Sequence, residues 1–206
     1  TTGTDPKTDR IIQFGCVLIE NGKIVTHFST DINPDQNIPA QIQTLTGITN
    51  QRTRKAPYFE DVALTITNLL EDTIFVAHNI HFDYPFLSNE LERCGMPPLT
   101  IPGIDTVELA QVFMPTSLSF RLKDLAEELH LVHENPHQAD SDADVTAQLL
   151  LYLDSKIKEL PIITVEKIVE TADQMAFQTK NYLEECLKEM QEDPRPLSDE
   201  LVIIRG

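Results

Sequence analysis

The stretch that decides the fold is HQADSDAD, from His137 to Asp144. It places a histidine ahead of three alternating aspartates, Asp140, Asp142 and Asp144, at the start of an apolar run with helical spacing. The apolar positions of this run are Val145, Leu149, Leu150, Tyr152, Leu153 and Ile157. Aspartate is a common N-cap and the helix dipole favours negative charge there, so capping accounts for one or two of these carboxylates. The stretch therefore predicts a helix over about 142–160 that begins at either a functional site or a structural cluster of carboxylates.

A second informative stretch is AHNIHFDYPFL, at 77–87. The wholly apolar segment 73–77 before it predicts a strand buried on both faces. Asp83 comes soon after this strand, and open α/β sheets place their ligands at the carboxyl ends of strands. Asp83 could instead cap the helix predicted over 82–94, with Pro85 in its first turn. The residues alone leave both interpretations open.

The rest of the chain reads as a mixed α/β domain. Alternating residues at 11–20 and 24–32, joined by Asn21-Gly22, predict an antiparallel hairpin. Further helices are expected over 39–45, 58–70, 105–114 and 122–129, with a short strand at 101–104 and a capping box at Asp105–Glu108. After Pro161 one long polar helix is expected over 164–192, then a strand-like segment at 201–204. We therefore expect a domain over 1–160 and a helical arm over 161–206 that leads towards a further domain.

Composition narrows the class of protein. The chain has 206 residues, 41% of them hydrophobic, which is enough for one substantial core. No apolar run is long enough to span a membrane. Cys16, Cys94 and Cys186 lie far apart and are odd in number, so we expect reduced thiols in a cytoplasmic protein.

The net charge of −17 argues against a surface that coats nucleic acid broadly, because such surfaces are basic. It does not exclude a small acidic site that first recruits divalent cations and then meets phosphate through them.

Together, the motifs Ala-His-Asn-x-x-Phe-Asp-x-x-Phe-Leu at 77–87 and His-x-Ala-x-x-Asp-Ala at 137–143 resemble the second and third motifs of the DEDDh, or DnaQ-like, 3′–5′ exonucleases. The segments at 45–49, 105–110 and 121–126 resemble further landmarks in the family's order. The resemblance covers about 1–160 and implies an RNase H-like mixed sheet flanked by helices. With its C-terminal helical arm, the chain is most like the N-terminal exonuclease domain of DinG-type DNA-repair helicases. A helicase would then be the further domain.

The resemblance also implies a chemistry and a set of residues. Such enzymes cleave phosphodiester bonds at nucleic-acid 3′ ends with two Mg²⁺ or Mn²⁺ ions held by carboxylates, and the substrate expected here is single-stranded DNA. Asp83 and Asp142 match metal ligands of the family, and His137 matches its general base. The positions that resemble substrate-binding residues are Thr1, Thr2, Leu45, Thr46, Gly47 and Asn79. The residues themselves allow other roles, which are core packing for Leu45 and a helix C-cap for Gly47.

Other polar side chains near these motifs receive no chemical role from the sequence. Histidines outside the motifs are usually structural or lie on the surface, and we expect this of His27, His130 and His133. His78 is expected to shape the floor of the site rather than to react. Asp144 is expected to be solvated near the start of its helix.

The chain departs from the family at its first motif, Asp-x-Glu, which directly precedes Thr-Thr-Gly in relatives. Here the sequence opens on that Thr-Thr-Gly, so we expect the central strand and two of the four carboxylates to lie upstream. Two ligands bind a cation far more weakly than four. The printed sequence alone is therefore expected to be inactive and its longer parent active.

Two alternatives remain open from the sequence. One is a proofreading exonuclease of the DNA polymerase III epsilon type, whose arm would bind a polymerase. The other is a degenerate nuclease module that only binds nucleic acid or docks a partner. The substitution Asp142→Ala separates the enzyme from the docking module, because only the enzyme would lose a cleavage activity.

Overall fold

The computed structural model describes residues 1–133, 135 and 137–193. Within them the chain forms a mixed α/β fold, as the sequence predicts. The strand expected at 201–204 lies outside the described residues.

The hairpin predicted near the N-terminus is confirmed. β1 (Gln13–Glu20) pairs with β2 (Lys23–Asp31) in an antiparallel ladder that runs from Gln13 opposite Asp31 to Glu20 opposite Lys23. Asn21 and Gly22 both have positive φ, 50° and 71°. These are the dihedrals that a two-residue turn needs to match the twist of the strands, and Asn-Gly adopts them readily.

The second pair of strands forms a separate ladder. β3 (Phe75–Ala77) runs parallel to β4 (Gly103–Asp105), and no strand pairing joins it to β1 and β2 among the described residues. Phe75 and Val76 are half-buried, although the sequence predicts a strand buried on both faces. The difference has a simple cause, since β3 has a strand neighbour on one side only and packing covers it incompletely.

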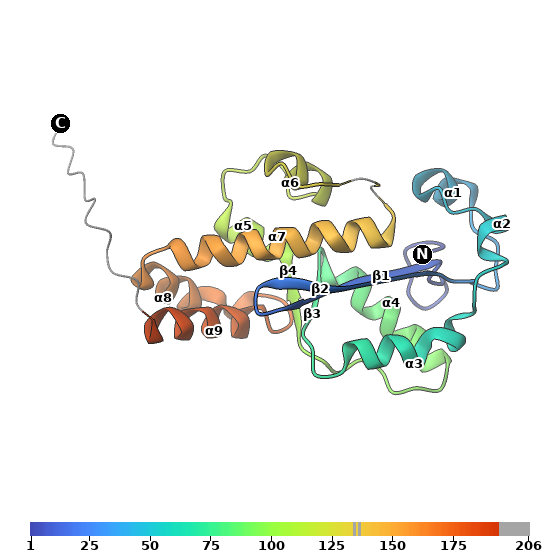
Figure 1. Ribbon diagram of the computed structural model, residues 1–206, viewed down its shortest axis with the longest axis horizontal. Helices are drawn as coiled ribbons and strands as arrows, with labels where there is room; N and C mark the ends of the chain where they lie inside the picture. Colours follow the sequence, from blue (N-terminus) through green and yellow to red (C-terminus); the bar gives the residue numbers. More distant parts are fainter. Residues whose placement is uncertain (134, 136, 194–206) are drawn as a thin grey trace.

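The helices surround these ladders in layers (Figure 1). α7 (Ala139–Glu159) lies along one face of the β1–β2 hairpin, and α3 (Phe59–Leu70) and α4 (Ile80–Arg93) pack against its other face. The remaining helices of the first 160 residues are α1 (Ala40–Thr46), α2 (Asn50–Thr53), α5 (Thr106–Phe113) and α6 (Leu122–Glu128). α2 is the one helix among them that the sequence pattern does not predict.

The single helix predicted over 164–192 is wrong. The chain forms α8 (Ile162–Thr171), a short 3₁₀ turn η1 (Ala172–Gln174) and α9 (Thr179–Glu192). The break has two anchors: the Phe177 ring packs against the Tyr84 ring with centroids 4.9 Å apart, and the backbone N–H of Gln178 donates to the carbonyl of Gly103 at 3.0 Å. These contacts come from distant parts of the chain, so local periodicity does not predict the break.

α8 and α9 share the larger hydrophobic core with α5 and α7. Val165 and Leu183 are fully buried against Leu149, Leu153 and Ile157 of α7. Residues 162–193 therefore rest on the core of the first 160 residues, while their role as an arm towards a further domain stays a prediction.

The three cysteines are free thiols, as expected. No helix in the described part of the chain is long and apolar enough to cross a membrane.

Candidate active site

The first turn of α7 lies directly against β1. α7 begins at Ala139 rather than near 142, so Asp142 falls in its first turn. The Gln13 side-chain oxygen accepts a hydrogen bond from the backbone N–H of Ala139 at 2.8 Å. A Cβ at Gly15 would lie 2.5 Å from the Ala139 backbone, so only glycine permits this approach. These contacts fix where the helix starts and hence where Asp142 stands.

Asp142 is held from the loop that precedes α7. Its Oδ1 accepts a hydrogen bond from His133 Nε2 at 2.8 Å and a second from the backbone N–H of His137 at 3.2 Å. The sequence places His133 among structural or surface histidines, and this interpretation misses its contact with Asp142. His137 itself is exposed and has a φ of 69°, a left-handed backbone that is strained for a residue other than glycine.

Asp83 lies in the first turn of α4, opposite α7. The N-cap of α4 is Asn79 rather than Asp83, so capping does not explain this aspartate. The enclosing protein raises the pKa of Asp83 to about 6 by partial desolvation, although the side chain keeps contact with solvent. The charge of Asp142 raises this pKa further. The structure therefore brings the carboxylates of both motifs within reach of each other's charge.

Asp105 organises the turn that leads into α4. Its side chain is buried and accepts hydrogen bonds from the backbone N–H groups of Asn79 at 3.1 Å and of Val107 at 2.8 Å. Asn79 has a φ of 71°, and its bond to Asp105 offsets the cost of that backbone conformation. Its own side chain is exposed and free to face a ligand.

The capping box predicted at 105–108 is half formed. Asp105 caps α5, but the Glu108 carboxylate accepts instead from the backbone N–H of Ala176 at 2.7 Å. Glu108 thereby ties α5 to the loop before α9.

His78 forms part of the interior beneath the two carboxylates. Its Nε2 donates to the carbonyl of Phe120 at 2.8 Å, and its Nδ1 lies 2.9 Å from the Thr106 hydroxyl. Burial lowers the pKa of His78, so the neutral ring is favoured. Both ring nitrogens are engaged, which fits the expected role in shaping the site.

The two N-terminal threonines differ in what they can offer a substrate. Thr2 is buried, and its hydroxyl accepts hydrogen bonds from the backbone N–H of Arg10 at 2.9 Å and the Gln36 amide at 2.6 Å. Thr1 is half-buried and its hydroxyl donates to the carbonyl of Gly3 at 2.6 Å. Thr2 is thus part of the framework, whereas the hydroxyl of Thr1 makes only a local bond.

The segment 45–47 ends α1. Leu45 is 55% exposed, so core packing does not explain it. Gly47 is the C-cap, with a φ of 71° and its N–H bonded to the carbonyl of Gln43, as one of the two interpretations of the sequence proposes. The Thr46 hydroxyl donates to the carbonyl of Ile42 at 2.8 Å. Leu45 is therefore the side chain of this segment that is free to meet a ligand.

Asp144 and His27 form a second contact between an aspartate of α7 and a histidine. His27 Nε2 lies 3.0 Å from Asp144 Oδ1, and the Gln148 amide donates to Asp144 Oδ2 at 2.7 Å. Both carboxylate oxygens are thus engaged, where the sequence predicts simple solvation. Each oxygen of Asp144 therefore has a side-chain partner, unlike Oδ2 of Asp142 among the described residues.

Asp83 and Asp142 are the right type of ligand for a hard divalent cation, but two carboxylates are too few for a complete site. Asp83 and Asp142 are oxygen ligands, which such cations prefer, and no lysine or arginine side chain pairs with either of them in the described part of the chain. The described residues contain no group of three or more histidine, cysteine, aspartate or glutamate side chains placed to hold a metal ion. Among the described residues, Asp83 and Asp142 alone therefore do not make a complete metal site.

Comparisons with known proteins agree with this geometry. The RNase_T model, described as an exonuclease family, matches residues 1–150. The 3′–5′ exonuclease DinG of Bacillus subtilis (strain 168) is 45% identical over 169 residues, which are 82% of this chain and 18% of that protein. DinG of Staphylococcus haemolyticus is 34% identical over 94% of this chain and 22% of its own length. The chain thus spans about a fifth of the length of the curated relatives it matches.

Solved structures give the same fold. Exonuclease X in complex with 5′ overhanging duplex DNA matches with a TM-score of 0.60 and 27% identity, over 75% of this chain and 87% of that one. Escherichia coli exonuclease I with a dT13 oligonucleotide matches with a TM-score of 0.70 and 20% identity, over 84% of this chain and 42% of that one. Exonucleases of this type use divalent metal ions. The predicted fold class and the predicted resemblance to DnaQ-like exonucleases, DinG-type above all, are confirmed, and the chain belongs to the RNase_T exonuclease family.

Proposed function

We propose that this chain is the exonuclease domain of a larger protein and removes nucleotides from the 3′ ends of DNA. The observation that carries the proposal is that Asp83 and Asp142, whose motifs lie far apart in the sequence, each stand in the first turn of a helix. Neither carboxylate is paired with a lysine or arginine among the described residues, and the charge of Asp142 contributes to the raised pKa of Asp83. Carboxylates without a lysine or arginine partner, with a histidine in the loop that precedes one of them, suit the hydrolysis of a phosphodiester.

The proposed cofactor is a pair of Mg²⁺ or Mn²⁺ ions, with Asp83 and Asp142 among their ligands. When bound, such ions neutralise the charge of the scissile phosphate and make an attacking water more acidic. We propose that a strand between β1 and β3 carries the two further carboxylates. Two features support it: the edges of β1 and β3 have no strand partner among the described residues, and the strand residues there are half-buried.

The remaining roles follow from position. His137 lies on the exposed loop beside Asp142 and would accept the proton of the attacking water, for which an imidazole is suited near neutral pH. Leu45 would pack against the terminal base, a contact that holds an unstacked 3′ end without reading its sequence. The other residues proposed to surround the terminal nucleotide are Thr1, Thr46, Gly47 and Asn79. Thr2, which is buried, would support these residues from behind.

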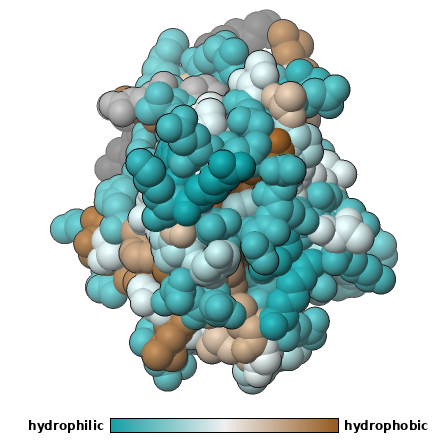
Figure 2. Space-filling view, turned by 90° about the vertical axis from the view of Figure 1, so that its right-hand side faces the viewer, coloured by the Kyte–Doolittle hydropathy of each residue, from teal (hydrophilic) through white to brown (hydrophobic). Residues whose placement is uncertain are grey.

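The surface supports local rather than extensive contact with DNA. Figure 2 shows the end of the molecule that carries α1 and α2, where hydrophilic residues predominate and hydrophobic ones form small separate spots. With a net charge of −17, the chain would attract a DNA end through its cations and not through a basic surface. The relatives named DinG are about five times as long as their match, which supports a further domain, and we propose that this domain is a helicase.

The test is the digestion of a single-stranded oligonucleotide by the whole protein with Mg²⁺ or Mn²⁺. A 5′ label should yield a ladder that shortens one nucleotide at a time, and a 3′ label should be released at once as a mononucleotide. The matched protein is Asp142→Ala, which should yield neither product. Digestion from the 5′ end, or cleavage that Asp142→Ala leaves intact, would refute the proposal and favour a docking module with a contaminating nuclease.

A further inference from the structure

The loop between α6 and α7 holds a buried histidine that the chemistry above does not use. The His133 side chain is 8% exposed, and its Nε2 lies 2.8 Å from Oδ1 of Asp142, whose side chain is 36% exposed. Because a carboxylate accepts hydrogen bonds, the ring nitrogen is the donor. A buried donor therefore reaches out to a carboxylate that faces solvent.

This contact leaves Asp142 with one engaged and one free oxygen. Oδ1 accepts from both His133 and the backbone N–H of His137, while Oδ2 accepts no hydrogen bond from the described residues. Asp144 provides the contrast, because both of its oxygens are engaged. Only the first arrangement presents a fixed carboxylate with an open oxygen.

Without these donors Asp142 would have a competing conformation. It lies in the first turn of α7, where free backbone N–H groups and the helix dipole attract carboxylates. Asp140, in the same turn, already bonds a backbone N–H of that turn, from Ser141 at 2.9 Å. His133 turns Asp142 away from this alternative and towards the loop.

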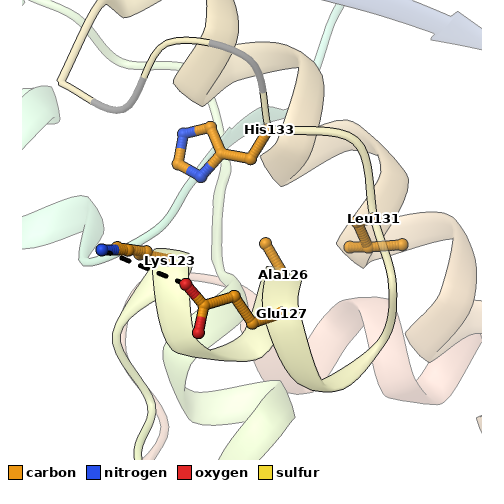
Figure 3. Close-up of a pocket in the computed structure, with 5 residues that line it drawn as sticks. All are labelled: Lys123, Ala126, Glu127, Leu131 and His133. Carbon is orange, nitrogen blue, oxygen red and sulfur yellow. Dashed lines mark ion pairs between the residues drawn. The ribbon is translucent and has the colours of Figure 1, made fainter.

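The other ring nitrogen makes no hydrogen bond to the described residues, so the bond to Asp142 is the ring's one polar contact with them. His133 Nδ1 is buried and has no hydrogen-bond partner among the described residues. Figure 3 shows the ring above α6, where it lines a cavity of about 140 Å³ with Lys123, Ala126, Glu127 and Leu131. An unpaired buried polar atom costs about 1–3 kcal/mol, which roughly offsets what the bond to Asp142 contributes. Residues that break such rules tend to serve function rather than folding.

We propose that His133 is a positioning residue, which orients the Asp142 carboxylate so that Oδ2 is available to a divalent cation. The inference rests on the proposed function, since it takes Asp142 as a metal ligand. It assigns His133 no contact with substrate and no proton transfer. Partners that orient a metal ligand in this way typically change metal affinity by 10–100-fold when removed.

The test measures Mn²⁺ binding to the whole protein in the absence of DNA, by the loss of the free Mn²⁺ electron paramagnetic resonance signal. His133→Ala should raise the dissociation constant about tenfold. His133→Gln should stay within about twofold of the wild type, because its amide nitrogen can donate from nearly the position of Nε2. His27→Ala is the matched control, since it removes the equivalent histidine from Asp144, and it should leave Mn²⁺ binding unchanged.

Thermal unfolding separates positioning from a structural role. His133→Ala also removes a buried ring and should lower the midpoint, whereas His133→Gln keeps a donor and most of the volume and should have a midpoint close to that of the wild type. Unchanged Mn²⁺ binding in His133→Ala would overturn the inference, as would a fall in both binding and midpoint that His133→Gln fails to rescue. Asp142→Asn separates the two proposals. If it weakens Mn²⁺ binding and His133→Ala does not, only the inference fails, and if it has no effect both fail.

Discussion

The two ends of α7 are built by different forces. Towards its C-terminus, Leu149, Leu153 and Ile157 are fully buried against α5, α8 and α9. At its N-terminus, Asp142 and His137 are partly or wholly exposed and are held by a few polar contacts with loops. One end is thus fixed by close packing, and the other presents charged groups that the fold does not neutralise. The difference teaches that stability and chemistry are carried by separate stretches of one helix, and they should respond to different substitutions.

The largest expected effect is on activity, at the N-terminal end. Asp142→Asn keeps the shape of the side chain but removes a charge from the proposed metal site, so the cleavage rate should fall about a thousandfold, or about 4 kcal/mol in transition-state free energy. Asp144→Asn is the matched control one half-turn away and should retain activity within about twofold. Single-turnover cleavage of a labelled oligonucleotide measures both. Equal losses in the two variants would mean that α7 needs negative charge in general and not a ligand at Asp142.

The next effect is on stability, at the C-terminal end. Leu153→Ala should lower the free energy of unfolding by about 2–5 kcal/mol, because it opens a cavity in the packed core. The exposed Leu118 offers a control, and Leu118→Ala should change stability by less than about 0.5 kcal/mol. Urea unfolding followed by circular dichroism measures both. Leu153→Ala should keep its activity per folded molecule. A loss of that activity would show that the two ends of α7 do not serve stability and chemistry separately.

A smaller effect is expected at Leu45, which lies in α1 and so belongs to neither end of α7. Leu45→Ala should reduce the apparent affinity for a DNA 3′ end about tenfold and leave the free energy of unfolding nearly unchanged, because the side chain is 55% exposed. Fluorescence anisotropy with a labelled oligonucleotide reports the affinity. Leu64→Ala, on the exposed side of α3, is a control of the same chemistry and should have no effect. A loss of stability in Leu45→Ala would instead show that the leucine packs in the core.

The smallest effect is a dependence of stability on pH from beneath the site. Burial lowers the pKa of His78 in the folded protein. As pH falls below about 6.5, this histidine therefore takes up a proton more readily in the unfolded chain than in the folded one. The free energy of unfolding should decrease as a result. Asp83 acts in the opposite direction, because its raised pKa favours the folded state as pH falls towards 4. The prediction is therefore made on a difference: between pH 7.5 and 5.5 the wild type should lose more stability than His78→Gln. If urea unfolding shows the same loss of stability in the wild type and in His78→Gln, His78 is not a source of the pH dependence.

Local pattern predicts most of the framework of this molecule. The Asn21-Gly22 turn and the helical spacing after His137 depend on neighbouring residues, and both appear as expected. The break at Phe177 does not, because its partners Tyr84 and Gly103 lie more than a third of the chain away. Burial of β3 was overestimated for a similar reason, since it depends on which strands lie beside it.

The candidate site shows the same limit. Asp83 and Asp142 can be found from their motifs, but the contact between His133 and Asp142 cannot, because loops carry no period that predicts a side-chain direction. The same loop holds two histidines before His137, namely His130 and His133, and nothing in the sequence distinguishes the one that contacts Asp142. Leu45 and Gly47 stand side by side in the sequence, yet only the structure shows that the first is exposed and the second ends a helix.

The central claim is that Asp83 and Asp142 bind the same divalent cations. Crystals of the whole protein soaked in Mn²⁺ test it most directly, through anomalous scattering from the ion. The account predicts an anomalous peak about 2.0–2.3 Å from a carboxylate oxygen of each residue, with His133 still bonded to Asp142. A peak that contacts neither carboxylate, or side chains too far apart to share ions about 4 Å from each other, would contradict it.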